Sequence, residues 1–200
     1  MFAVGHLSLG YLFAKASARS LKVEVDLSLV FLLSLIPDID LIVPGLVHRT
    51  VTHSIVVSII VFLPFFVFYK ARAVPYFLAL VQHGLVGDFI VGAQAGVQLL
   101  WPLTLAYYGL PISMYSSVDI VLELSSFLVA GAVMLKTGDV KKLLKGRFSH
   151  LSLILPTFTV ILPTLIQFPL TVPTTLVVPH IAYLVLFTLS MANVFCQFRF

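Results

Sequence analysis

Residues 27–69 read LSLVFLLSLIPDIDLIVPGLVHRTVTHSIVVSIIVFLPFFVFY, two apolar runs with a polar segment between them. The polar segment carries Pro37-Asp38-Ile39-Asp40, His48-Arg49 and Thr52-His53-Ser54. Each run approaches the roughly 20 helical residues that cross about 30 Å of hydrocarbon. Ionisable groups at the edge of hydrocarbon cost free energy, so their position between two such runs indicates a functional site.

The composition excludes a soluble domain. Hydrophobic residues make up 60% of the chain and charged residues 10%, with a mean hydropathy of +1.11, whereas soluble domains carry about 25% charged residues. We predict an all-α fold, a polytopic membrane helix bundle of about seven transmembrane helices at 2–18, 24–43, 51–69, 74–93, 118–135, 151–169 and 174–195. No linker or repeat divides the chain, so we expect a single integral membrane domain over 1–200, with a motif-bearing half at 1–117 and accessory helices at 118–200.

The first apolar run ends in Ala16-Ser17-Ala18, which is typical of a signal-peptide cleavage site. It lacks the basic residues that begin such a peptide, so we expect it to be retained as a helix. The single cysteine, Cys196, excludes an internal disulfide and a thiolate zinc cluster. Any metal would therefore be held by nitrogen and oxygen ligands.

The positive charges predict an orientation, because Lys and Arg that flank membrane spans are retained on the cytoplasmic side. All but one of them fall in the loops after the first, third and fifth predicted helices or in the tail: Lys15, Arg19, Lys22, Lys70, Arg72, Lys136, Lys141, Lys142, Lys145, Arg147 and Arg199. The exception is Arg49, within the polar segment. We therefore predict a multi-pass protein of the cell membrane, with the N-terminus outside, the C-terminus inside and the polar segment towards the extracytoplasmic face.

This orientation brings seven ionisable residues to one depth near the outer surface. They are His6, Asp38, Asp40, His48, His53, His83 and Asp88. Neutral imidazole and carboxylate bind Zn²⁺, Mn²⁺ or Fe²⁺, and carboxylates can bridge two ions about 3.5–4 Å apart in hydrolytic sites. We predict that the seven bind one or two divalent ions, most simply zinc.

Each residue also has a purely structural interpretation. Asp38 and Asp40 could end a helix after Pro37 in the headgroup region, and His53 could belong to an N-terminal helix cap. A single histidine such as His6 could be a hydrogen-bonded interior residue. The joint occurrence of four histidines and three aspartates at one depth favours a metal site over these alternatives.

Helix geometry restricts the predicted ligands. His83 and Asp88 are five residues apart, about 140° around a straight α-helix, so both can face one ion only if the helix is distorted. Gly84 and Gly87 lie between them and could permit a kink or the close approach of a neighbouring helix. Asp38 and Asp40 diverge on a regular helix, and spacing leaves open which of them is a ligand and which orients a histidine.

Several motifs, taken in order, resemble those of the membrane-bound metal-dependent hydrolase family, whose bacterial members include LexA-regulated inner-membrane proteins of the YdjM type. They are His6, Pro37 to Asp40, His48 to Ser54, His83 to Asp88 and Gly96 to Pro102. Position 50 is Thr where the family often has Gly. The resemblance covers about the first 105 residues and implies a multi-helix membrane fold with metal-dependent hydrolysis, distantly similar to zinc phospholipase C. It implies no substrate.

The leading functional hypothesis is a metal-dependent hydrolase that acts on a phosphoester or lipid headgroup linkage. Asp40 would be a bridging ligand or general base, and Arg49 would neutralise developing negative charge. Membrane lipid would be the environment and a candidate substrate. A metal or proton transporter using the same ligands, or a non-catalytic protein stapled by its metal, remains an alternative. Only Ser28, Ser34 and Ser58 interrupt the apolar stretches leading inward, which favours an enzyme.

Other polar residues have less defined roles. Asp119 and Glu123 share a helix face and could lie beside the site, as could His180. The basic run before His150 lacks the aromatic pattern of nucleic-acid binding, so we expect no nucleic-acid partner. Aromatic residues in 94–117 predict an interfacial flap that turns at Pro102 and forms one wall of a lipid-accessible cleft.

Overall fold

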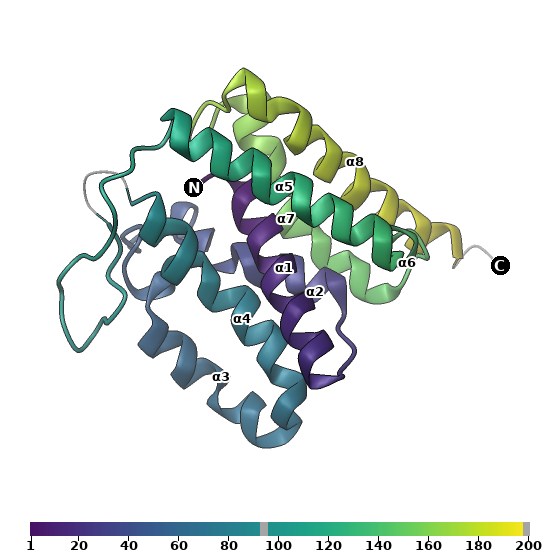
Figure 1. Ribbon diagram of the computed structural model, residues 1–200, viewed down its shortest axis with the longest axis horizontal. Helices are drawn as coiled ribbons and strands as arrows, with labels where there is room; N and C mark the ends of the chain where they lie inside the picture. The colour runs from purple at the N-terminus through teal and green to yellow at the C-terminus, as the bar shows by residue number, and fades with distance from the viewer. Residues whose placement is uncertain (93–95, 198–200) are drawn as a thin grey trace.

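The structure, a computed structural model, describes residues 1–92 and 96–197, and its regular elements there are helices (Figure 1). The α-helices are α1 (Ala3–Leu21), α2 (Leu27–Leu35), α3 (Ile55–Tyr69), α4 (Val74–Gln82), α5 (Ser117–Thr137), α6 (Asp139–Leu143), α7 (Ile154–Ile161) and α8 (Thr174–Gln197). Tighter 3-10 segments are η1 (Ile36–Leu41), η2 (Val51–His53), η3 (Lys70–Ala73) and η5 (Phe148–Leu153). Two π-helical segments are η4 (His83–Asp88) and η6 (Leu162–Ile166).

The predicted all-α fold is confirmed, and each of the seven predicted segments overlaps one α-helix of eight or more residues. Helix α6, with 5 residues, is an additional short element. Within the described residues, four helical stretches are long and apolar enough to cross a membrane: Ile55–Asp88, Ser117–Thr137, Phe148–Ile166 and Thr174–Gln197. The seven crossings and their orientation stay predictions. Arg199, one of the charges behind that orientation, lies outside the described residues.

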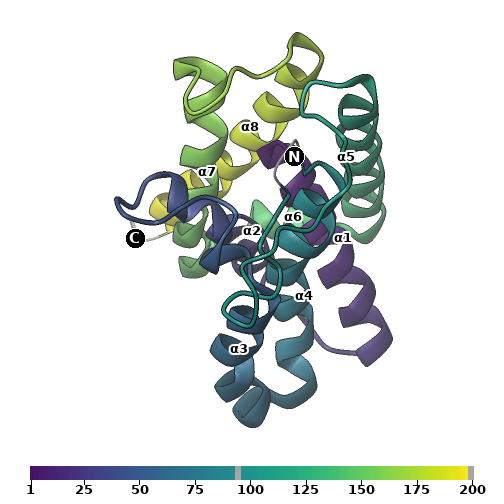
Figure 2. The ribbon, with the colours of Figure 1, turned by 90° about the vertical axis from the view of Figure 1, so that its left-hand side faces the viewer.

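Helix α1 lies at the centre of the bundle, against α2, α4 and α5. Its inner face buries Leu7 and Tyr11, which pack with Phe31 of α2 and Phe187 of α8 in the main apolar core. Figure 2 shows the α3–α4 hairpin at one end of the molecule and α7 and α8 at the other. Helix α1 therefore lies between elements from both ends of the molecule, and His6 is in its first turns.

The irregular segment from 96 to 116 packs against the polar motif and hydrogen-bonds to it. Backbone bridges join Val97 to Tyr108, and the Ile55 amide donates to the Leu99 carbonyl at 2.9 Å. Ser54 caps α3 by accepting from two backbone amides of its first turn, while its hydroxyl donates to the Trp101 carbonyl at 2.6 Å. The capping interpretation of this motif therefore holds for Ser54. The predicted flap 94–117 packs on the motif loop, and its residues 94 and 95 lie outside the described residues.

Candidate metal centre

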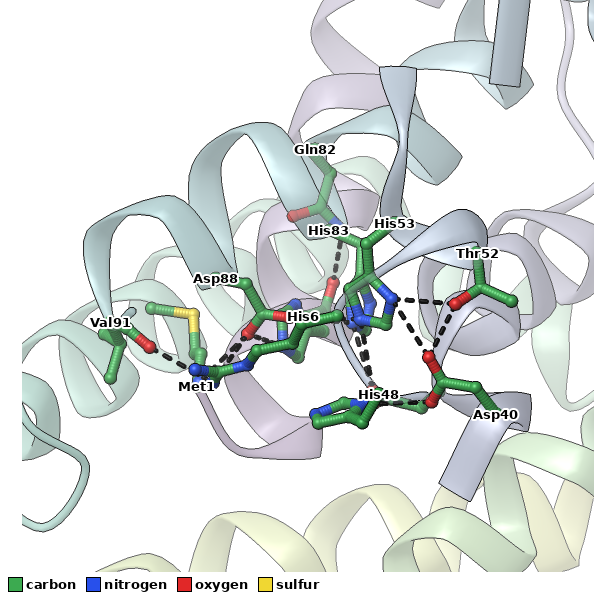
Figure 3. Close-up of polar contacts among 12 residues, drawn as sticks. Met1, His6, Asp40, His48, Thr52, His53, Gln82, His83, Asp88 and Val91 are labelled. Atoms are coloured by element: carbon green, nitrogen blue, oxygen red, sulfur yellow. Dashed lines mark hydrogen bonds and ion pairs between the residues drawn. The ribbon is translucent and has the colours of Figure 1, made fainter. Parts of the chain in front are cut away.

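Six of the seven predicted ligands converge on one buried cluster near the start of α1 (Figure 3). They form three groups whose ligand atoms lie within 4.8 Å of one another: His6, Asp38 and His83; Asp38, His48 and His53; and His53, His83 and Asp88. The groups share members, so they make a single cluster, termed here the His/Asp cluster. Its residues come from α1, η1, the loop after it, η2 and η4, which are far apart in sequence.

Four atoms at the middle of the cluster have the spacing of a tetrahedral site. His53 Nε2 lies 3.1 Å from Asp88 Oδ2 and 3.7 Å from Asp38 Oδ1. His83 Nε2 lies 3.2 Å from Asp38 Oδ1 and 3.7 Å from Asp88 Oδ2. Two ligand atoms bound to one tetrahedral ion at about 2.0–2.2 Å are about 3.3–3.6 Å apart. The four imidazole–carboxylate distances are thus close to the spacing expected around one ion, and among the described residues His53, His83 and Asp88 form a complete ligand group.

Burial leaves three of these atoms without a hydrogen bond. His53 Nε2, His83 Nε2 and Asp88 Oδ2 are enclosed and make no hydrogen bond with a described residue, and their polar neighbours are the other candidate ligand atoms. A buried polar atom without a partner costs about 1–3 kcal/mol, and such atoms are rare in native proteins. Three of them directed at one point are explained by a shared ligand. A divalent cation suits the donor set of imidazole nitrogens and carboxylate oxygens.

The opposite ring nitrogens are held by acceptors. His83 Nδ1 lies 2.7 Å from the Ser34 carbonyl oxygen, which can only accept, so this nitrogen donates and Nε2 presents its lone pair to the cluster. His53 Nδ1 lies 2.9 Å from the Thr52 hydroxyl oxygen, which itself donates to Asp40 Oδ2, and this chain orients the ring in the same way. Metal-binding histidines characteristically donate their second nitrogen to a carbonyl or carboxylate, which fixes the ring.

The structure separates the two aspartates that spacing alone leaves equivalent. Asp38 belongs to two of the ligand groups, whereas Asp40 belongs to none of those found among the described residues. Asp40 lies on the far side of the His53 ring (Figure 3), where it contacts His48 Nδ1 at 2.9 Å and accepts from the Thr52 hydroxyl at 2.6 Å. Its contacts are those of a residue that orients two imidazoles.

A π-turn resolves the conflict between His83 and Asp88. The segment His83–Asp88 is π-helical, with hydrogen bonds that span five residues, so two side chains five apart lie on nearly the same face. Glycines make this turn possible. A Cβ atom at Gly84 would meet the His53 carbonyl oxygen at 2.5 Å, and one at Gly87 would meet the His6 ring at 2.5 Å. The predicted distortion is present, and both glycines allow neighbouring elements to approach closely.

Arg49 lies beside the cluster in a left-handed backbone conformation, with φ of 64°. Its guanidinium donates to the Gly92 carbonyl at 2.7 Å and lies 3.3 Å from Asp88 Oδ1. Its side chain is 12% exposed, which leaves an edge open to an adjacent cavity. Arg49 thus fastens the motif loop to the end of η4 and places a positive charge at the border of the cluster.

The additional acidic and imidazole candidates lie outside the ligand groups found in the described chain. Glu123 accepts a hydrogen bond from the Phe2 amide, so it satisfies the N-terminus of α1 from α5. Asp119 accepts from the Tyr115 amide at 3.0 Å. His180 lies 2.7 Å from the Leu176 carbonyl of its own helix, and its ring packs against Phe2.

Three supporting residues are not apparent from the sequence as parts of the site. Ser34 contributes only its carbonyl, which no side-chain pattern reveals. Gln82 donates to the His6 carbonyl at 3.1 Å and is buried directly before the π-turn. The position of Thr52 before a predicted helix suggests a helix N-terminal cap, yet its hydroxyl donates to the Asp40 carboxylate. The sequence feature that could have revealed Gln82 and Thr52 is their position directly before His83 and His53.

The sequence matches a family model over residues 1–163, described as YdjM inner membrane protein. No curated protein and no solved structure matches the chain. The matched region contains every residue of the His/Asp cluster and extends beyond the motifs that carry the resemblance, through α5 and α7. The match spans most of the chain, and the protein belongs to the YdjM inner membrane protein family.

Proposed function

We propose that the protein is a metal-dependent hydrolase of the membrane that cleaves a phosphoester, with a phospholipid headgroup linkage as the favoured substrate. The observation that carries this proposal is the convergence of three enclosed ligand atoms that make no hydrogen bond, beside a cavity that is also lined by an arginine. Buried imidazole and carboxylate groups of this kind are expensive in a membrane protein unless they have a function.

Four residues would hold the ion, namely Asp38, His53, His83 and Asp88. His6 and His48 lie at its edges and would complete its coordination or hold a second ion. Zinc suits two imidazoles and two carboxylates best, with manganese or iron as alternatives. A bound divalent ion supplies the Lewis acidity that polarises a phosphoryl oxygen and acidifies water. Arg49 would neutralise the charge that develops on the phosphoryl group, because guanidinium binds phosphate oxygens while remaining protonated.

The cavity beside the cluster supports a substrate with an apolar part. It has a volume of about 110 Å³, and its polar end is formed by Asp38, His48, Arg49 and Asp88. The remaining wall is largely apolar and comes from α7, η6 and the loop after η6, including Leu155, Phe158, Leu162 and Phe168. A phospholipid would place its phosphate at the polar end and the start of an acyl chain along α7. The predicted flap contributes Met114 to this wall.

The transporter alternative requires a polar route from the cluster through the bundle. Further along the bundle from the cluster, α1, α2 and α4 pack together through Ala14, Val30 and Ala79, which are at most 1% exposed. This apolar contact favours a site that substrates enter and leave from the same side.

The decisive experiment is an assay of the purified protein with its metal restored, on phospholipids of several headgroups and on soluble phosphodiesters. We expect release of a phosphorylated or free headgroup, lost on chelation and regained with zinc or manganese. Metal uptake into sealed vesicles, blocked by His53→Ala and without any hydrolysis, would instead establish the transporter.

Asp40→Asn is expected to weaken metal binding by about 10–100-fold while leaving a folded protein with a site that still fills at high metal concentration. The physical reason is that an amide can still contact His48 and Thr52 but no longer draws the protons of both imidazoles. Metal titration of the purified variant, followed by competition with a chelator, measures the change. Complete loss of binding would show that Asp40 is itself a ligand.

Phe158→Ala is expected to raise KM for a long-chain phospholipid roughly tenfold, equivalent to about 1.4 kcal/mol, while KM for a short soluble phosphodiester stays unchanged. The ring lines the apolar wall of the cavity, and Phe158 is not one of the candidate metal ligands. Phe68→Ala, on the lipid-exposed end of α3, is the matched control. Equal effects on both substrates would contradict the proposed position of the acyl chain.

A further inference from the structure

A second polar cavity lies at the opposite end of the bundle from the His/Asp cluster. Arg19, on its wall, follows His6 by thirteen residues along α1, a rise of about 20 Å at 1.5 Å per residue. Figure 1 shows α1 running from the N-terminus to the other end of the molecule. The cavity has a volume of about 480 Å³ and is formed by the end of α1, the link to α2, α6 and the link that follows α6.

Basic side chains dominate the cavity. Its walls carry Lys15, Arg19, Lys142, Lys145 and Arg147, against two carboxylates, Glu24 and Asp139. Five cations and two carboxylates leave a formal charge of +3. Two regions far apart in sequence supply these cations, the end of α1 and the stretch from α6 to Arg147, so the charge is gathered by the fold.

Asp139 organises one side of the cavity. It is fully buried, forms ion pairs with Lys15 and Lys142, and accepts from the hydroxyls of Tyr11 and Thr137, both at 2.8 Å. Burial opposes ionisation of this carboxyl, but the hydrogen bonds, first among them that of Lys15, outweigh it and hold its pKa below the usual range. Asp139 therefore stays ionised and holds two lysines at the cavity wall.

The other three cations have no such partner. Arg19, Lys145 and Arg147 are exposed, and none of them forms an ion pair with a residue in the described part of the chain. Three unpaired cations that share one cavity repel each other, and a bound anion relieves that repulsion. Arginine binds the oxygens of a phosphate in a bidentate manner, which gives two of these residues a specific use.

The remaining wall indicates where the anion comes from. Ala18, Val23, Val25 and Leu27 line the cavity next to the cations. A soluble phosphate gains nothing from apolar contacts, whereas the glycerol and first methylenes of a lipid do. Basic pockets between helices at the membrane surface are suited to anionic headgroups. We propose that this cavity binds the phosphate of an anionic lipid headgroup, on the membrane face opposite the His/Asp cluster.

The test compares two double variants that remove the same charge. Arg19→Gln/Lys145→Gln alters unpaired cavity cations, whereas Lys136→Gln/Lys141→Gln alters neighbouring exposed cations that do not line the cavity. Binding of phosphatidylglycerol to the full-length protein is measured in phosphatidylcholine nanodiscs by native mass spectrometry, and Tm confirms folding. We expect the cavity variant to bind phosphatidylglycerol at least tenfold more weakly than the wild type, and the control less than twofold more weakly.

Two results would overturn the proposal. Equal losses in both variants would mean that the basic residues attract anionic lipid only through their general charge. Inorganic phosphate that displaces phosphatidylglycerol at micromolar concentration, with binding lost in the cavity variant, would identify a site for a soluble anion. Neither result depends on the hydrolase proposal, because no metal and no turnover enter the measurement.

Discussion

Asp38→Ala and His53→Ala are each expected to purify folded, without bound divalent metal, and with turnover reduced by at least three orders of magnitude. Both residues belong to two of the three ligand groups, so either change breaks the centre of the cluster. Loss of a ligand leaves the other buried groups uncompensated and makes the ion weakly held. Metal content by elemental analysis, followed by hydrolysis of the best phosphoester substrate, checks the prediction.

His150→Ala is the matched control for these changes. His150 is also buried, at 3% exposed, but it lies in η5, and its ring accepts from the Arg147 amide. We expect it to retain the metal content of the wild type. If the two cluster variants keep their metal, the cluster is not the binding site. If they lose the metal and unfold together, the ion serves as a structural staple.

Composition and motif order predict more of this protein than helix periodicity does. The apolar runs locate every long helix, because a membrane protein has few polar residues that could disguise them. The same scarcity makes the ionisable residues conspicuous, and six of the seven predicted ligands do gather in one cluster. Ionisable groups that are buried are stabilised by partners of opposite charge, which favours their convergence, and their role as metal ligands stays a prediction.

Local backbone geometry could not be predicted to the same extent. The residues Gly84 and Gly87 indicate a distortion, but a kink, a π-turn and a close helix contact all fit the same letters. The structure contains a π-turn and close approaches at both glycines. Which conformation forms depends on the neighbours, here η2 and α1, and these contacts are absent from a one-dimensional pattern.

Supporting contacts were the hardest to foresee. Asp38 and Asp40 are separated by one residue and are chemically identical, yet a 3-10 turn directs one into the cluster and the other behind His53. The Ser34 carbonyl that orients His83 comes from a helix whose side chains give no hint of it. Tertiary packing decides such roles. The sequence therefore defines the candidate residues but does not show which of them bind the ion and which orient a ligand.

Gly84→Ala is expected to destabilise the protein by about 1–3 kcal/mol and to weaken metal binding at least tenfold. The added methyl group would lie 2.5 Å from the His53 carbonyl oxygen, and a backbone atom cannot rotate away. Either η2 or the π-turn has to move, and both carry ligands. Thermal unfolding and metal titration of the same preparation measure the two effects.

Two other glycines provide the comparison that separates this effect from a general cost of alanine. A methyl group added at Gly131 of α5 would meet no atom within 4 Å, so Gly131→Ala is expected to be neutral or to stabilise the helix by up to about 1 kcal/mol, with metal binding unchanged. The nearest atoms to a methyl group added at Gly87 belong to the His6 side chain and not to a backbone, so the effect of Gly87→Ala on stability is expected to be smaller than that of Gly84→Ala. Equal behaviour of all three variants would contradict the role assigned to the π-turn, because only Gly84 brings the ligand-bearing η4 against the backbone of a second ligand.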